Sequence, residues 1–337
     1  MGRLAQTLGF RNKTMLITLC ENEDGNLLPA AYNTIASIPE NLLRHAEHGL
    51  RHPVSAYSTS LRLIGLQWIK FLEHLEKLQN EYAWEGKTTK AAAATAEYAQ
   101  LLHRLNEHQD ACNAVLRAIC PPERAKPHHV DANYLDKAKF PGWKQFREAT
   151  RGYREEHIGL IVNNLKHRQG ELSSISFQSP FEFRPGYFLR DVITSGVIGP
   201  SRRLHSGGNT AFSFARDQLL HLWWLYRIGE LLANTLSSAI AQLSNVKVVA
   251  SSRSNGGLPW TELLAKLTAM KPEYYPDELK KPQPLAILSL QPSTFSVEFP
   301  SKARGIPINP TDLRVSTDLT LDGNYPSNKM PYFGHMP

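Results

Sequence analysis

The stretch SFARDQLLHLWWLYRIGELLANTLSSAIAQL, residues 213–243, decides the expected fold. Its apolar residues recur at every third or fourth position, which is the spacing of a buried helix face. They also cover more than one side of the helix, so this segment is expected to lie centrally among other elements. The sequence therefore predicts a long central helix over about 211–243.

Three other segments show the same spacing and predict three further long helices. Pro121 and Pro122 end the second of these helices, and Gly170 ends the third. Four long helices joined by loops predict a mainly α fold, an antiparallel four-helix bundle. The three further helices are expected over about 56–83, 89–119 and 143–168. The expected core of the bundle contains Trp68, Leu72, Leu102, Leu105, Leu165, Leu222 and Leu225.

Two regions are expected to add β-structure to the bundle. The connection between helices three and four, residues 170–210, is too long for a simple turn and contains strand-like pieces at 174–177, 181–183 and 187–193. After residue 245, VKVVAS, PLAILSL and TFSVEF also resemble strands, and the last two are expected to form a hairpin. The chain is thus divided into an N-terminal segment with a short helix (1–54), the bundle (55–245) and a mixed β and irregular C-terminal extension (246–337).

Composition indicates a folded protein with a mild excess of positive charge. Lys and Arg number 38 against 31 Asp and Glu, which gives a net charge of +7. This charge permits an acidic partner such as RNA without requiring one. The three cysteines form no CxxC pair, and the N-terminus has no continuous apolar segment of a secretory signal. The cysteine pattern favours a reducing cytoplasm as the expected location. No stretch is apolar enough to span a membrane, so no membrane contact is expected.

The end of the third helix, VNNLKHRQG at residues 162–170, carries the order N-x-x-K-H in Asn163, Lys166 and His167. This order resembles a motif of HEPN-like proteins, the higher-eukaryote and prokaryote nucleotide-binding helical bundles. The resemblance covers this motif and the four-helix layout. It implies metal-independent RNA cleavage, in which the histidine acts as a general acid or base toward the 2′-hydroxyl or the leaving group. It also implies a site built across a homodimer. Val162 stands where the active family members carry the arginine that stabilises the transition state.

A substitute for the missing arginine is sought among pairs with the spacing R-x(4–6)-H. Three pairs fit, namely Arg124/His129, Arg151/His157 and Arg216/His221, and chance alone gives about as many. Arg151 and His157 are the strongest of these because they lie on the same expected helix as His167. The alternative for Lys166 and His167 is that they are cations at a helix C-terminus, where the helix dipole favours them.

A second candidate site precedes the fourth helix, in GPSRRLHSGGNTAF at residues 199–212. Arg202, Arg203 and His205 stand before two glycines and a helix start, an arrangement that can bind an anion. If the two helix ends meet, these residues would form one basic patch with His167 and Arg168. The alternative is a glycine turn in which Asn209 or Thr210 caps the helix.

Three histidines of the short helix expected at 39–53 are candidate metal ligands. His45, His48 and His52 would share one helix face. They more readily form a polar surface, because three ligands from one straight helix rarely converge on one ion. The sequence therefore predicts neither a metal nor a cofactor.

Three functions follow from these patterns. The first is a non-catalytic HEPN-like module that binds RNA, nucleotide or a protein partner, in a defence or toxin-type system. The second is a metal-independent ribonuclease that uses His167 or an Arg/His pair. The third is a helical scaffold subunit without a small-molecule site. The valine at position 162 favours the first function over the second.

Overall fold

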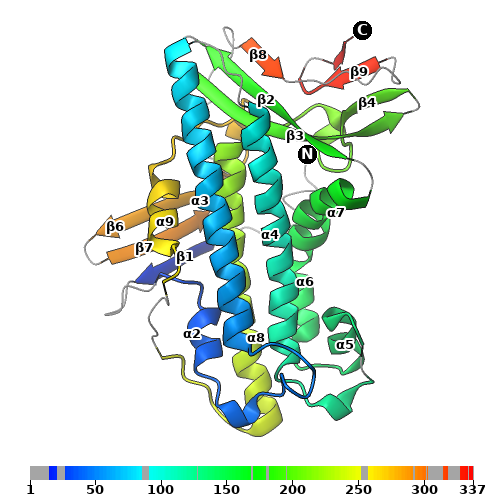
Figure 1. Ribbon diagram of the computed structural model, residues 1–337, viewed down its shortest axis with the longest axis vertical. Coiled ribbons are helices and arrows are strands. Elements are labelled where there is room, and N and C mark those ends of the chain that lie inside the picture. The colour runs from blue at the N-terminus through cyan, green and yellow to red at the C-terminus, as the bar shows by residue number, and fades with distance from the viewer. Residues whose placement is uncertain are drawn as a thin grey trace.

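The computed structural model gives the fold for most of the chain. Its long helices lie side by side along the molecule, with β-sheets at one end and along one side (Figure 1). The residues described are 15–20, 27–85, 91–126, 128–167, 170–179, 182–194, 196–251, 257–290, 293–300, 302, 314–317, 327–332 and 334–336.

All four predicted long helices form. They are α3 (Pro53–Glu85), α4 (Ala91–Arg117), a third that combines α6 (Trp143–Tyr153) and α7 (Gly159–His167), and α8 (Phe214–Ser244). A π-helical turn at Arg154–Ile158 joins α6 to α7. The residues expected in the core are buried, and Leu165 is partly buried against that core. Shorter helices are α2 (Ala31–Ala36), α5 (Asp131–Lys137) and α9 (Trp260–Ala269).

The antiparallel four-helix bundle expected from the sequence is nevertheless wrong, because two β-sheets pack with the helices. The region expected to be a loop with strand-like pieces forms β2 and β3, which pair antiparallel from Glu171↔Arg190 to Ser179↔Glu182. These two strands form the centre of a mixed sheet with the order β10-β9-β4-β3-β2-β8, and β5 also pairs with β3. The strands are β2 (Glu171–Ser179), β3 (Glu182–Thr194), β4 (Val197–Pro200), β5 (Phe212–Ser213), β8 (Arg314–Thr317), β9 (Ser327–Met330) and β10 (Gly334–Met336).

A second sheet explains why α8 is apolar on more than one side. Its strand order is β1 (Met15–Cys20), β7 (Ser293–Phe299) and β6 (Leu285–Leu290), with antiparallel pairing throughout. Strand β7 packs on α8, with the rings of Trp223 and Phe299 5.4 Å apart and those of Tyr226 and Phe295 5.6 Å apart. The sheet thus covers a face of α8 that the sequence assigned to neighbouring helices.

Local structure differs from expectation at three smaller places. Residues 39–53 do not form the predicted helix, since only Glu40–Leu42 make a 3₁₀ turn and Pro53 begins α3. Residues 246–250 carry no strand. The N-cap of α8 is Ser213, whose Oγ accepts a hydrogen bond from the amide of Arg216 at 3.3 Å, and not Asn209 or Thr210.

Candidate metal centre

Three buried side chains meet where the start of α8 faces the π-helical turn. Asp217 and His221 stand one helical turn apart on α8, and therefore project from the same face. His157 comes from the π-helical turn, which is a feature often found at functional sites. The turn requires a glycine at its end, because a Cβ atom on Gly159 would lie 2.1 Å from the carbonyl oxygen of Arg154.

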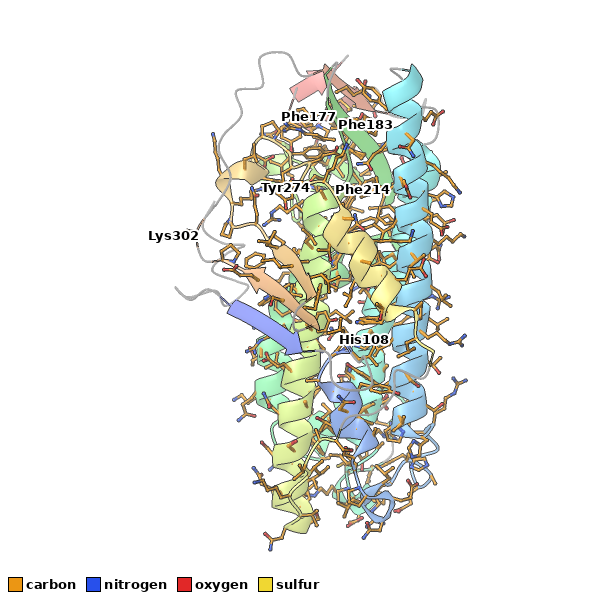
Figure 2. All side chains as sticks on the ribbon, turned by 90° about the vertical axis from the view of Figure 1, so that its left-hand side faces the viewer. His108, Phe177, Phe183, Phe214, Tyr274 and Lys302 are labelled. Atoms are coloured by element: carbon orange, nitrogen blue, oxygen red, sulfur yellow. The ribbon has the colours of Figure 1, made fainter. Side chains whose placement is uncertain are left out.

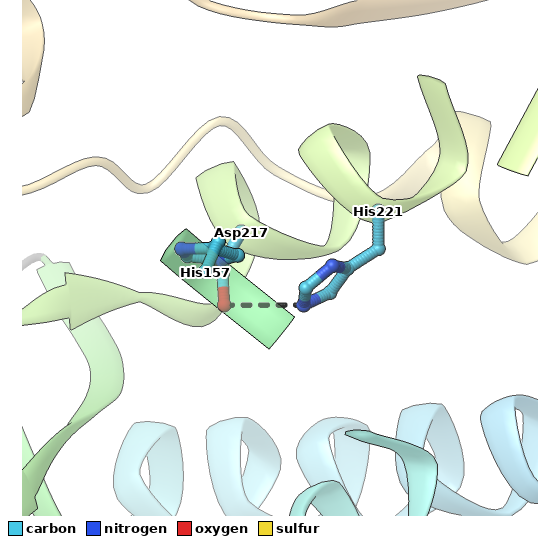
Figure 3. Close-up of side chains that lie close together, drawn as sticks. All are labelled: His157, Asp217 and His221. Atoms are coloured by element: carbon cyan, nitrogen blue, oxygen red, sulfur yellow. Dashed lines mark hydrogen bonds and ion pairs between the residues drawn. The ribbon is translucent and has the colours of Figure 1, made fainter. Parts of the chain in front are cut away.

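The two imidazoles approach different oxygens of one carboxylate. His157 Nε2 lies 3.1 Å from Asp217 Oδ1, and His221 Nε2 lies 3.3 Å from Asp217 Oδ2 (Figure 3). One nitrogen from each histidine and one carboxylate oxygen all lie within 4.8 Å of one another. Ligands that share one metal ion lie at such separations, since each bond to the ion is about 2.0–2.2 Å long.

Three tyrosines hold these side chains in place. The hydroxyl groups of Tyr98 on α4 and Tyr187 on β3 both donate to Asp217 Oδ2, at 2.8 and 2.5 Å. The hydroxyl of Tyr153 on α6 lies 2.8 Å from His221 Nδ1. In known metal sites the second nitrogen of a histidine ligand is usually hydrogen-bonded, which fixes the orientation of the ring. The tyrosines therefore lie where residues that hydrogen-bond to the ligands of a metal site would lie.

The cluster is almost completely shielded from water. The exposed fractions of His157, Asp217 and His221 are 2%, 1% and 0%. Burial acts to raise the pKa of Asp217, but the nearby His221 and His157, the latter with a hydrogen bond to Oδ1, hold that pKa well below its usual value. Burial lowers the pKa of His221, against the opposing effect of Asp217. Asp217 is therefore an ionised carboxylate in the core, and a metal ion bound here would replace a proton on each coordinating imidazole nitrogen.

Aromatic rings separate the cluster from the surface. Phe214 lies near the start of α8 (Figure 2) and packs edge-on against Tyr98, with centroids 4.9 Å apart, and stacks on Tyr187 at 5.7 Å. A shallow depression between α3, α8 and residues 270–273 is lined by Phe214 but by none of the three candidate ligands.

The motif at the end of α7 lies on the surface. The side chains of Asn163, Lys166 and His167 are exposed, and Arg168 lies outside the described residues. Arg151 is also exposed and forms an ion pair with Glu155 at 3.3 Å. Its expected partner His157 points instead into the core, toward Asp217. The Arg151/His157 pair expected from the sequence therefore does not form.

The second predicted site divides between surface and core. Arg202, Arg203 and Asn209 are exposed, whereas His205 is fully buried and its Nε2 accepts a hydrogen bond from the amide of Leu189 at 2.9 Å. Burial lowers the pKa of His205 to about 3, so this ring is neutral at physiological pH. The expectation that His205 contributes to a basic anion-binding patch is therefore wrong.

Sequence reasoning missed most of the cluster that the structure assembles. The sequence motifs assign His157 and His221 only to Arg/His pairs, and no motif points to Asp217 or to the tyrosines as site residues. One signal was available, since D-x-x-x-H in an apolar helix places Asp217 and His221 on one face. The third residue lies 60 positions earlier in the chain, so no local pattern joins it to the other two.

Comparison with models of known protein families, with curated proteins and with solved structures finds no match for this chain. Among the described residues, none of the helices combines the length and the apolar character that crossing a bilayer demands.

Proposed function

We propose that this protein binds a divalent transition-metal ion through His157, Asp217 and His221. The observation that carries the proposal is the convergence of two imidazole nitrogens and one carboxylate oxygen within 4.8 Å of one another. Two histidines and one carboxylate are a ligand set used for zinc and for non-haem iron, and imidazole suits both ions. Three protein ligands would leave a coordination position for water or another small ligand.

The main alternative is a polar network that serves only to stabilise the fold. One feature favours a metal over that alternative. His221 Nε2 is buried and makes no hydrogen bond within the described residues, and only the approach to Asp217 Oδ2 at 3.3 Å compensates it. A buried polar atom without a partner is costly, and a cation at His221 Nε2 would offset that cost.

Metal binding would also connect elements that are distant in sequence. The ligands come from the π-helical turn and from α8, while Tyr98 and Tyr187 attach the same carboxylate to α4 and β3. An ion bound here would cross-link the third long helix to the central helix. It would therefore raise the free energy of unfolding as well as supply a Lewis acid.

The test is a zinc titration of metal-free protein, with a chromophoric chelator as competitor. We expect one ion per chain and a higher Tm in the presence of zinc. Asp217→Asn and His221→Gln should weaken zinc binding by at least tenfold. In known sites, mutation of residues that only hydrogen-bond to the ligands already lowers metal affinity 10–100-fold. His167→Gln is the matched control, since that histidine is exposed, and its affinity should equal that of the unchanged protein. Failure of the unchanged protein to bind zinc, iron or cobalt would refute the proposal.

The binding of RNA, nucleotide or a protein partner stays a prediction. It is supported by the HEPN-like motif and by the exposed side chains of Lys166, His167, Arg202 and Arg203. This surface function and the buried metal centre involve different residues and do not exclude one another.

A further inference from the structure

We infer that Tyr98 and Tyr187 determine which ions the centre accepts, because they restrict Asp217 to one coordinating oxygen. The inference rests on the proposed metal site and adds the coordination mode to it. A carboxylate that binds through a single oxygen, together with two imidazoles, gives a site of low coordination number. Such a site favours Zn²⁺, Fe²⁺ and Co²⁺ over ions that require many oxygen ligands, such as Mn²⁺, Mg²⁺ and Ca²⁺.

Both tyrosine hydroxyls donate to Asp217 Oδ2, and neither donates to Oδ1. An ionised carboxylate has about four lone-pair positions, two on each oxygen. Oδ2 thus receives both tyrosine donors and lies 3.3 Å from His221 Nε2, whereas Oδ1 contacts only His157 Nε2, at 3.1 Å. A metal ion that replaced the proton of His157 Nε2 would therefore bind at Oδ1.

The two donors are fixed in the core. The side chains of Tyr98 and Tyr187 are fully buried, with ring centroids 5.1 Å apart. Because the oxygen of an ionised carboxylate can only accept a hydrogen bond, each hydroxyl acts as a donor to Oδ2.

Removal of the hydroxyl groups would change the coordination of the ion. Without Tyr98 and Tyr187 as donors, both lone pairs of Oδ2 become available, and the carboxylate is free to bind through both oxygens. The coordination number would rise by one, which suits larger ions that prefer oxygen. The discrimination between Co²⁺ and Mn²⁺ would consequently decrease.

The experiment uses Co²⁺, whose visible absorption is strong in four-coordinate sites and weak in five- or six-coordinate ones. We compare the unchanged protein with Tyr98→Phe, Tyr187→Phe and the double variant, all of which retain the buried rings. The matched control is Tyr275→Phe, because that fully buried hydroxyl donates to the carbonyl oxygen of Ile175 and contacts none of the three candidate ligands. The control should keep the intensity of the cobalt band.

The inference predicts a strong band for the unchanged protein and a decrease of severalfold in the double variant, with smaller decreases in the single variants. The ratio of the Mn²⁺ to the Co²⁺ dissociation constant should also decrease by about tenfold in the double variant, a change of about 1.4 kcal/mol. Equal band intensities at one bound Co²⁺ per chain would overturn the inference and leave the metal site intact. Absence of Co²⁺, Zn²⁺ and Fe²⁺ binding by the unchanged protein would overturn both.

Discussion

Replacement of Glu278 by Gln should change how the stability of the protein depends on pH. Glu278 is buried beside the first residues of α8, where its Oε1 accepts a hydrogen bond from the amide of Ser213 at 3.1 Å. Its Oε2 accepts from Ser213 Oγ at 2.6 Å and from the amide of Tyr275 at 2.9 Å. This carboxylate therefore holds the start of the helix that carries Asp217.

The magnitude follows from the pKa of Glu278. Burial raises this pKa from 4.5 to about 7, against the opposing charge of Arg216 and the hydrogen bond from Ser213. In the pH range between these values the folded state holds a proton that the unfolded state has lost. The free energy of unfolding therefore decreases as pH rises from about 4.5 to 7. Above that range Glu278 is ionised in both states, and its titration no longer changes the free energy of unfolding. The total decrease from this group is about 3 kcal/mol.

The assay is chemical denaturation of the unchanged protein and of Glu278→Gln at several values between pH 4.5 and 8. Other groups titrate in this range, but they do so in both proteins, so the difference between the two unfolding free energies isolates Glu278. The variant loses one acceptor oxygen at every pH, which adds a constant offset. We expect the difference to shift by about 3 kcal/mol in favour of the variant as pH rises. A difference that does not change with pH would refute the reasoning.

Three further predictions concern the core and the surface. Leu222→Ala should lower the free energy of unfolding by roughly 2–5 kcal/mol in denaturation experiments, because Leu222 is fully buried; a loss below 1 kcal/mol would contradict its place in the core. If the surface binds RNA, replacement of Arg202 and Arg203 by Ala should reduce the slope of log affinity against log salt concentration by about 2; an unchanged slope would exclude phosphate contacts by these arginines. His167→Ala should leave the Tm within about 2 °C, because an exposed cation at a helix end contributes only about 0.3–1 kcal/mol; a larger loss would give His167 a structural role.

The helical part of the fold could be predicted because its signal is local. Residues such as Trp68 and Leu222 recur with the period of a helix, and this period alone reveals which face is buried. The sheets could not be predicted in the same way. Strand β1 pairs with β7, so Met15 faces Phe299 from the opposite end of the chain. No pattern within either segment specifies such a partner.

The candidate metal centre likewise brings together residues whose proximity no local sequence pattern specifies. The spacing of Asp217 and His221 along one helix could be recognised, but His157 joins them only through the packing of two helices. The π-helical turn that directs His157 inward has no sequence signature beyond the glycine at 159. Conversely, the sequence predicts a basic patch in which His205 joins the two arginines that precede it. The ring of His205 lies instead in the core, where it accepts a hydrogen bond from the amide of Leu189.

The most direct test of the metal centre is X-ray absorption spectroscopy at the zinc K-edge, on protein loaded with one equivalent of Zn²⁺. The ligands His157, Asp217 and His221 predict a first shell of nitrogen and oxygen only, at about 2.0–2.2 Å. They also predict the outer-shell scattering of two imidazole rings, reduced to one ring in His221→Gln. A sulfur shell at about 2.3 Å, or an imidazole signal that is unchanged in His221→Gln, would show that the ion binds elsewhere and would contradict the proposed centre.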